Sequence, residues 1–293
     1  MFQVILSLFL FLSTQSHAAR ATKYDNIVTQ MEQLAQANAA QVQIFTLANN
    51  DQNIPIKGLK IGNGPTNSLV VATHHGNEYG STEVGIGFAK YLATAPIKDQ
   101  TVWVIPVLNI SGYNKNLREE KNAKSLLDAN RDYTGPCVTG KSFQLRSTSA
   151  LAQFLVDKNI VISATLHTFS AVVVYPWGIS THDLATPYDN QYKKLVEAAT
   201  VESGYKTGNN TDLLYPADGT FEDYAYWKHG IWSLLFELGF SHNPDTQEVL
   251  NMVNSNSPGI KRFLETAPKQ RVAAHDFKGQ CDYSRARQRI FLE

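Results

Sequence analysis

Cysteine is scarce in this chain, and neither sign of charge dominates. The sequence holds two cysteines, Cys137 and Cys281, and its 26 basic residues balance 26 acidic ones. A neutral chain gives no electrostatic reason to expect nucleic acid or another polyanion as its partner. Internal repeats, low-complexity segments and Pro/Gly/Ser-rich linkers are also absent from the sequence. The length of 293 residues therefore allows one large domain or two small ones.

No apolar run in the sequence reaches the roughly 20 residues that a membrane span requires. The one candidate segment, residues 4–12, is followed by the small residues Ser16 and Ala18. This pattern predicts a secretory signal peptide over residues 1–18, with secretion or export to the periplasm and no stable membrane insertion after cleavage. No Lys or Arg precedes the apolar run, so an uncleaved anchor is the alternative.

The two cysteines are candidates for a disulfide bond near the end of the chain. In an exported protein two cysteines often pair. A Cys137–Cys281 bridge would tie the C-terminal tail, about residues 270–293, to the middle of the chain. In the entropy model, closing so long a loop contributes roughly 3–5 kcal/mol. Two free thiols are the alternative.

Strand-like and helix-like segments alternate along most of the sequence. Residues 101–108 form a continuous apolar run, typical of a strand buried on both faces. Residues 82–92 have helical spacing, with Ser81 as a possible N-cap. The alternation predicts an α/β fold, a single domain over residues 19–293 with a central mixed, mostly parallel twisted β-sheet flanked by helices. The expected strands are 41–47, 54–61, 68–73, 101–108, 160–166, 172–175 and 231–238, and the expected helices are 24–38, 82–92, 148–158, 190–203 and 246–266.

Several polar groups lie where these strands end, which is where α/β sheets carry their chemistry. His75-Gly76-Asn77-Glu78 places an imidazole and a carboxylate three residues apart. A catalytic zinc takes three such ligands, so this step supplies two. His167 ends another strand, and Glu237 interrupts an apolar run, where an unpaired carboxylate is costly. A structural histidine and a buried ion pair are the alternatives for these two.

The chain carries, in order, H-x-x-E at 75–78, D-x-N-R at 128–131, a strand-terminal His before Tyr-Pro-Trp-Gly at 175–178, Tyr215, and Phe-Glu-Leu at 236–238. This series resembles the zinc metallocarboxypeptidase family, whose digestive members are the carboxypeptidases A and B. The intervals from His167 to Gly178 and from Tyr215 to Glu237 equal those of the digestive members, and the match runs over about residues 24–240.

The resemblance implies a hydrolase with one zinc ion per chain, held by His75, Glu78 and His167. It also implies that Glu237 is the general base for the attacking water and passes the proton to the leaving amine. Zinc in such a site acidifies water and polarises the scissile carbonyl.

Further residues take supporting roles by the same resemblance. Asp128 is similar to the carboxylate that orients the first zinc histidine. His74 does not have the three-residue step to Glu78 and is interpreted as a non-ligand. In this family the peptide bond after the second zinc histidine's neighbour is often cis, which here is Thr168-Phe169.

The substrate-binding residues implied by the resemblance lie between residues 118 and 215. Asn130 and Arg131 correspond to the clamp for the substrate's terminal carboxylate, which suits the arginine fork. Tyr215 corresponds to the mobile tyrosine that closes over the bound residue. Arg118 is our choice for the oxyanion arginine, and a solvated run of charges that includes Glu120 is the alternative.

The chain departs from the digestive enzymes at several points. The stretch between Glu78 and His167 is shorter, which indicates trimmed loops. Asn77 stands where the digestive members carry an arginine, so contacts to substrate residues upstream of the cleaved bond are expected to be weaker. The catalytic pattern begins soon after the predicted signal peptide, so no prodomain is expected.

The interval to Glu237 places Glu222 at the floor of the pocket for the leaving residue. A carboxylate there prefers a positively charged side chain. This predicts cleavage of C-terminal Lys or Arg, or of an amine-bearing residue such as diaminopimelate. If Glu222 turned outward or paired with a base, Asp218 and Asp223 would be the alternative acidic residues.

Other functions stay open at this point. A bacterial murein-peptide carboxypeptidase or amidase acting on diaminopimelate-containing stem peptides also fits an exported member with trimmed loops. A deacylase or a non-catalytic binding protein is a further alternative, although Glu237, Arg131 and Tyr215 favour a peptidase.

Overall fold

The computed structural model describes residues 21–282, so the predicted signal peptide lies outside the described residues, as does the last part of the tail. The strands are β1 (Val42–Asn49), β2 (Pro55–Ile61), β3 (Thr66–Ala72), β4 (Gln100–Ile105), β5 (Glu120–Lys121), β6 (Leu126–Leu127), β7 (Ile160–His167), β8 (Val172–Tyr175), β9 (Lys206–Asn209) and β10 (Trp232–Glu237). The helices are α1 (Lys23–Ala37), α2 (Tyr79–Thr94), α3 (Ile110–Lys115), α4 (Arg146–Asp157), α5 (Asp189–Ala199), α6 (Asn210–Leu213), α7 (Phe221–His229) and α8 (Thr246–Thr266), with a 3₁₀ turn at Ala129–Arg131.

Eight of the strands form one mixed sheet in the order β1-β2-β4-β3-β7-β10-β8-β9. The four central strands β4, β3, β7 and β10 are mutually parallel. Antiparallel pairing enters on both sides, where β2 joins β4 and β8 joins β10. The predicted mixed, mostly parallel α/β sheet is confirmed.

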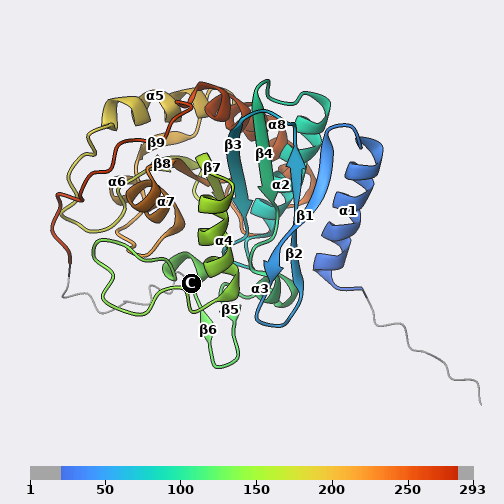
Figure 1. Cartoon of the computed structure of the whole chain (residues 1–293), viewed down its shortest axis with the longest axis horizontal. Coiled ribbons are helices and arrows are strands. Elements are labelled where there is room, and N and C mark those ends of the chain that lie inside the picture. Colours follow the sequence, from blue (N-terminus) through green and yellow to red (C-terminus); the bar gives the residue numbers. More distant parts are fainter. Residues whose placement is uncertain (1–20, 283–293) are drawn as a thin grey trace, which may run out of the picture.

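Helices cover both faces of this sheet (Figure 1). On one face α8 packs against α2 and α5, and on the other α4 and α7 contact each other and the strands. The central strands are consequently largely buried, and every residue of β4 and β7 is buried. Continuous apolar runs suit such two-sided burial.

The predicted elements are recovered within a few residues of their ends, with one error at α2. Ser81 is not the N-cap, because α2 begins at Tyr79 and Glu78 occupies the cap position. The Ser81 hydroxyl instead donates to the Glu78 carbonyl at 2.7 Å. Glu78 therefore stands at the junction of loop and helix, with its own side chain free to point elsewhere.

The tail is held against the body of the protein by covalent and polar contacts. Cys137 and Cys281 form a disulfide with Cα atoms 5.4 Å apart, so the alternative of two free thiols is wrong. The amide of Gln280 donates to the carbonyl of His182, and Thr181 bonds to Asp282. Among residues 21–282, no helix is long and apolar enough to cross a membrane.

Glu120 is buried in β5, although Lys115 and Lys121 in the same charged stretch are exposed. Its side chain is 0% exposed. One carboxyl oxygen accepts from the Ser147 hydroxyl at 2.5 Å, and the other has no hydrogen-bond partner among the described residues. Burial, opposed by the bond from Ser147, raises the pKa of Glu120 to about 8.

This burial makes stability depend on pH with a definite sign. Between the unfolded pKa of about 4.3 and the folded value, the folded protein binds more protons, so the free energy of unfolding falls as pH rises and levels off above pH 8. We expect Glu120→Gln to gain stability over the wild type across this window, by up to about 1.4 kcal/mol per pH unit. Denaturant titrations near pH 5, 7 and 9 measure it. The exposed Glu197→Gln serves as control, and a pH-independent difference for Glu120→Gln would contradict the prediction.

Candidate metal centre and active site

Three parallel strands bring the predicted catalytic residues to one edge of the sheet. β3 leads into His75, β7 ends at His167, and β10 ends at Glu237. In the pairing register Ala72 lies beside Leu166, and Glu237 lies directly beside His167. The common direction of these strands therefore gathers residues that are distant in sequence.

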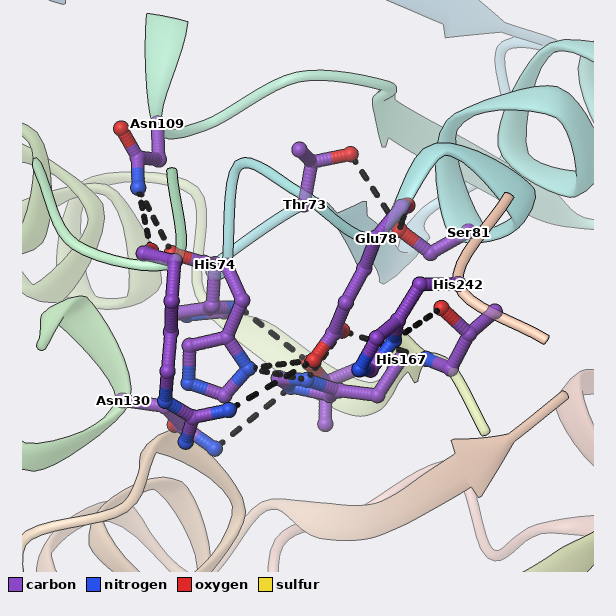
Figure 2. A network of polar contacts seen from close by, with 12 residues as sticks. Thr73, His74, Glu78, Ser81, Asn109, Asn130, His167 and His242 are labelled. Carbon is purple, nitrogen blue, oxygen red and sulfur yellow. Dashed lines mark hydrogen bonds and ion pairs between the residues drawn. The ribbon is translucent and has the colours of Figure 1, made fainter. Parts of the chain in front are cut away.

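His75, Glu78 and His167 form a buried cluster whose donor atoms face one another. The Glu78 carboxylate lies 2.7 Å from His75 Nδ1 and 3.0 Å from His167 Nδ1, and the two Nδ1 atoms are 3.2 Å apart. Figure 2 shows Glu78 reaching from its helix toward His167, with Asn130 approaching the same histidine from another segment. The Thr168 amide also donates to Glu78, and the Thr168–Phe169 peptide bond is cis, as the resemblance implies.

The geometry of this cluster fits zinc. Zinc–nitrogen bonds of about 2.0–2.1 Å place the donors of a tetrahedral site roughly 3.3–3.4 Å apart. The separations in the cluster are close to this and slightly shorter, and the donors are the two imidazoles and one carboxylate that catalytic zinc commonly takes. Two imidazole nitrogens that face the same carboxylate also need a shared cation or proton between them.

The remaining ring nitrogens of the histidines fix their orientation. His75 Nε2 lies 3.0 Å from Asp128 Oδ1, so Nδ1 is the atom left to face the cluster. His74 is different, because its Nε2 contacts the Tyr133 hydroxyl at 3.0 Å and its Nδ1 contacts Thr165 at 3.4 Å. With both nitrogens engaged elsewhere, His74 is not positioned as a ligand.

Gly76 is required by the packing of the loop between His75 and Glu78. A Cβ at this position would lie 2.1 Å from the backbone carbon of Gly112, in α3. The Gly76 amide donates to the Arg118 carbonyl at 3.2 Å. The loop that carries the first two donor residues is thereby pressed against the segment that carries Arg118.

The buried carboxylates of the site titrate in opposite directions. Burial alone would raise the pKa of Glu78, but His75 and His167 more than offset this and lower it. For Glu237, burial and the neighbouring Glu78 charge raise the pKa well above its usual value, against the opposing effect of Arg118. Glu237 Oε2 is buried and accepts no hydrogen bond from the described residues. The site thus contains a carboxylate with a raised pKa, Glu237, beside the donor cluster.

Arg118 lies at the rim of the cluster and is 35% exposed in its side chain. Its Nε and Nη2 donate to Asp128 Oδ2 at 3.1 and 3.0 Å, and its Nη1 lies 3.8 Å from Glu78 Oε1. A guanidinium held by Asp128 is in place to meet negative charge that develops near the donor cluster.

A second group of polar residues lines the pocket next to the cluster. Asn130 Oδ1 accepts from the Phe221 amide at 2.9 Å, and Asn130 Nδ2 approaches His167 Nε2 at 3.5 Å. Arg131 donates to the Asn130 carbonyl at 2.6 Å and to the Tyr215 hydroxyl at 3.3 Å. The pocket lining is His75, Asn130, Arg131, His167, Asn210, Leu214, Tyr215, Ala217, Thr220, Glu222, Leu235 and Glu237.

Glu222 lies in this pocket and is 0% exposed. Asp218 and Asp223 are not among the lining residues; Asp223 accepts from the Gly178 amide at 3.0 Å, and Asp218 accepts from the Gly219 amide at 2.8 Å. Sequence reasoning missed Asn210, which donates to Glu222. The polar run 208–212 shortly before Tyr215 was the one available signal for it.

Two imidazoles and a carboxylate at the parallel strand ends, with a carboxylate and arginines beside them, define a zinc hydrolase type of site. The chain belongs to the zinc carboxypeptidase family, whose model matches residues 27–257. Carboxypeptidase D of Drosophila melanogaster is 22% identical over 304 residues, covering 86% of this chain and 21% of that protein. Human carboxypeptidase B is 24% identical over 262 residues, covering 74% and 62%. The chain thus spans about a fifth of the length of the carboxypeptidase D relatives.

Solved structures share the fold. Bovine thrombin-activatable fibrinolysis inhibitor, solved with a tick carboxypeptidase inhibitor, superposes with a TM-score of 0.73 at 18% identity, over 82% of this chain and 94% of that one. The murein-tripeptide amidase of Escherichia coli O157 superposes with a TM-score of 0.54 at 14% identity, over 78% and 93%.

Proposed function

We propose that the protein is an exported zinc-dependent metallocarboxypeptidase that releases a C-terminal residue with a positively charged side chain. The observation that carries the proposal is Glu222, whose carboxylate lines the same pocket as Arg131 and Glu237. Its Oε2 is buried and has no hydrogen-bond partner among the described residues. A charge-assisted contact to a substrate cation would satisfy it.

His75, Glu78 and His167 would hold the zinc ion in this proposal. Bound zinc would supply a Lewis acid and acidify the attacking water. Asp128, through its contact with His75 Nε2, would keep that imidazole in the tautomer that presents Nδ1.

Glu237 would be the general base. Its strand register places it beside His167, and its buried Oε2 has no hydrogen-bond partner among the described residues, so it is available to accept a proton. The proton that it takes from water would pass to the leaving amine. Arg118 would stabilise the negative charge that forms on the carbonyl oxygen.

Asn130, Arg131 and Tyr215 would select the end of the chain. The arginine fork can bind the terminal carboxylate through two parallel hydrogen bonds. The Tyr215 ring already lies over the guanidinium of Arg131, 5.8 Å from ring centroid to Cζ. This arrangement would let the tyrosine close over a bound terminal residue.

Export through the predicted signal peptide, residues 1–18, is part of the proposal. The Cys137–Cys281 disulfide supports it, because such bonds form and persist in oxidising compartments outside the cytosol.

Two variants should distinguish the residues needed for zinc binding from the residue needed only for turnover. We expect the wild type to bind zinc and hydrolyse peptides, and Glu237→Gln to keep zinc while its kcat falls at least about a hundredfold, the range for loss of a general base. His75→Ala should lose both, because one donor of three is removed. Metal analysis after dialysis and peptide kinetics measure the two properties. Hydrolysis that persists in Glu237→Gln, or zinc retained by His75→Ala at wild-type affinity, would refute these roles.

The pocket makes a second prediction about the leaving residue. We expect peptides ending in Lys to be hydrolysed faster than matched peptides ending in Leu or Glu. The Glu222 carboxylate attracts the lysine ammonium and repels a terminal glutamate side chain. Glu222→Gln should reduce kcat/KM for the Lys peptide by about tenfold or more, the usual weight of a charged hydrogen bond, and spare the Leu peptide. The exposed Glu197→Gln is the matched control. Faster cleavage of the Leu or Glu peptide by the wild type would overturn the preference.

Murein stem peptides are the second candidate substrate. A diaminopimelate-containing peptide also presents an amine to Glu222, and the E. coli murein-tripeptide amidase shares the fold. Both candidate substrates would therefore present a cation to the same carboxylate.

Purified muropeptides test this candidate directly. If murein is the substrate, the wild type should cleave the diaminopimelate-containing stem, and the mass of the products identifies the bond. Glu237→Gln provides the inactive control. Muropeptides that stay intact while a Lys-terminated peptide is consumed would exclude murein.

A further inference from the structure

Asn210 binds one carboxylate oxygen of Glu222 and leaves the other without a hydrogen-bond partner among the described residues. The Asn210 amide nitrogen donates to Glu222 Oε1 at 2.9 Å. Oε2 is buried and has no partner among the described residues. Both side chains line the pocket, and both residues are almost fully buried, at 3% and 0% exposure.

The position of Asn210 is fixed by its surroundings. It is the first residue of α6, where the next residue, Thr211, bonds through its amide to the Trp177 carbonyl at 3.3 Å. Its side chain lies against Gly178, where a Cβ would come within 2.5 Å of the amide nitrogen. A side chain at 178 would displace Asn210 from Glu222, so the glycine keeps this contact possible.

Only one of two adjacent acidic residues lines the pocket, which suits a substrate with a single positive charge. Asp223, adjacent to Glu222 in α7, accepts from the Gly178 amide at 3.0 Å and does not line the pocket. Burial and the charge of Glu222 raise the pKa of Asp223 well above its usual value, which favours its neutral form. Glu222 is then the carboxylate of this pair that lines the pocket, with Leu214 and Leu235 available to contact an aliphatic stem.

The side chains of arginine and lysine differ in how many carboxylate oxygens they bind best. A guanidinium is recognised best by two parallel hydrogen bonds to both oxygens. An ammonium is a compact point charge that one oxygen satisfies. We infer that Asn210 is a specificity-determining residue that sets this pocket for primary amines, such as the side chains of lysine and diaminopimelate, in preference to arginine. The inference rests on the proposed function, in which Glu222 receives the side chain of the leaving residue.

The test compares the zinc-loaded enzyme on matched peptides ending in Lys, Arg and Leu. We expect the wild type to favour Lys over Arg in kcat/KM by about tenfold or more, the size of one charge-assisted hydrogen bond. Asn210→Ala frees Oε1 and opens space, so the Lys/Arg ratio should fall by a similar factor while the rate on Arg rises. The exposed Asn254→Ala should leave the ratio unchanged. A general loss of folded protein lowers both rates together and does not move the ratio.

A second measurement needs no variant at this position. Free lysine should inhibit the wild type as a product at about tenfold lower concentration than free arginine. Equal rates on Lys and Arg with both above Leu, or equal inhibition by the two amino acids, overturn the role of Asn210 and leave the proposed function standing. A wild type that prefers Leu overturns the proposed pocket and this inference together.

Discussion

The parallel register of β3, β7 and β10 is the constraint on which the rest of the site depends. These strands end at the same edge of the sheet, so His75, His167 and Glu237 meet although they lie far apart in sequence. The burial of the strands on both faces holds that register, because a shift of one residue would turn every side chain to the opposite face. Loops elsewhere can then vary in length without displacing the residues at these strand ends.

Around this edge, the buried carboxylates differ in how far their oxygens are paired. Glu78 is shared by two imidazoles, and Asp128 is held by Arg118 and His75. Glu237 and Glu222 each keep one buried oxygen that the described residues do not satisfy. Unsatisfied buried acids are costly, and here both residues line the same pocket.

The sequence predicted most of the strands, because β-branched apolar runs such as residues 160–166 leave few other choices. Short-range spacing indicated His75 and Glu78 as donors, and His167 followed from the resemblance to the zinc metallocarboxypeptidases. Prediction from the sequence failed where contacts between distant segments determine the structure. α7 was not predicted, because six of its nine residues are buried and no amphipathic pattern marks it. The contact between Asn210 and Glu222 joins two segments through the fold, and no local signal encodes it. The burial of Glu120 within a charged stretch was missed for the same reason.

The glycine inside His75-Gly76-Asn77-Glu78 has a consequence for recognising relatives of this protein. Metal chemistry explains the histidine and the glutamate, but the close approach to Gly112 explains Gly76. A homologue that retained every donor and acquired a larger residue here would have to move α3 away, and Arg118 with it, because the Gly76 amide bonds to that segment. In a relative, a larger residue at this position would therefore indicate a displaced α3 and Arg118, even where every donor residue is kept.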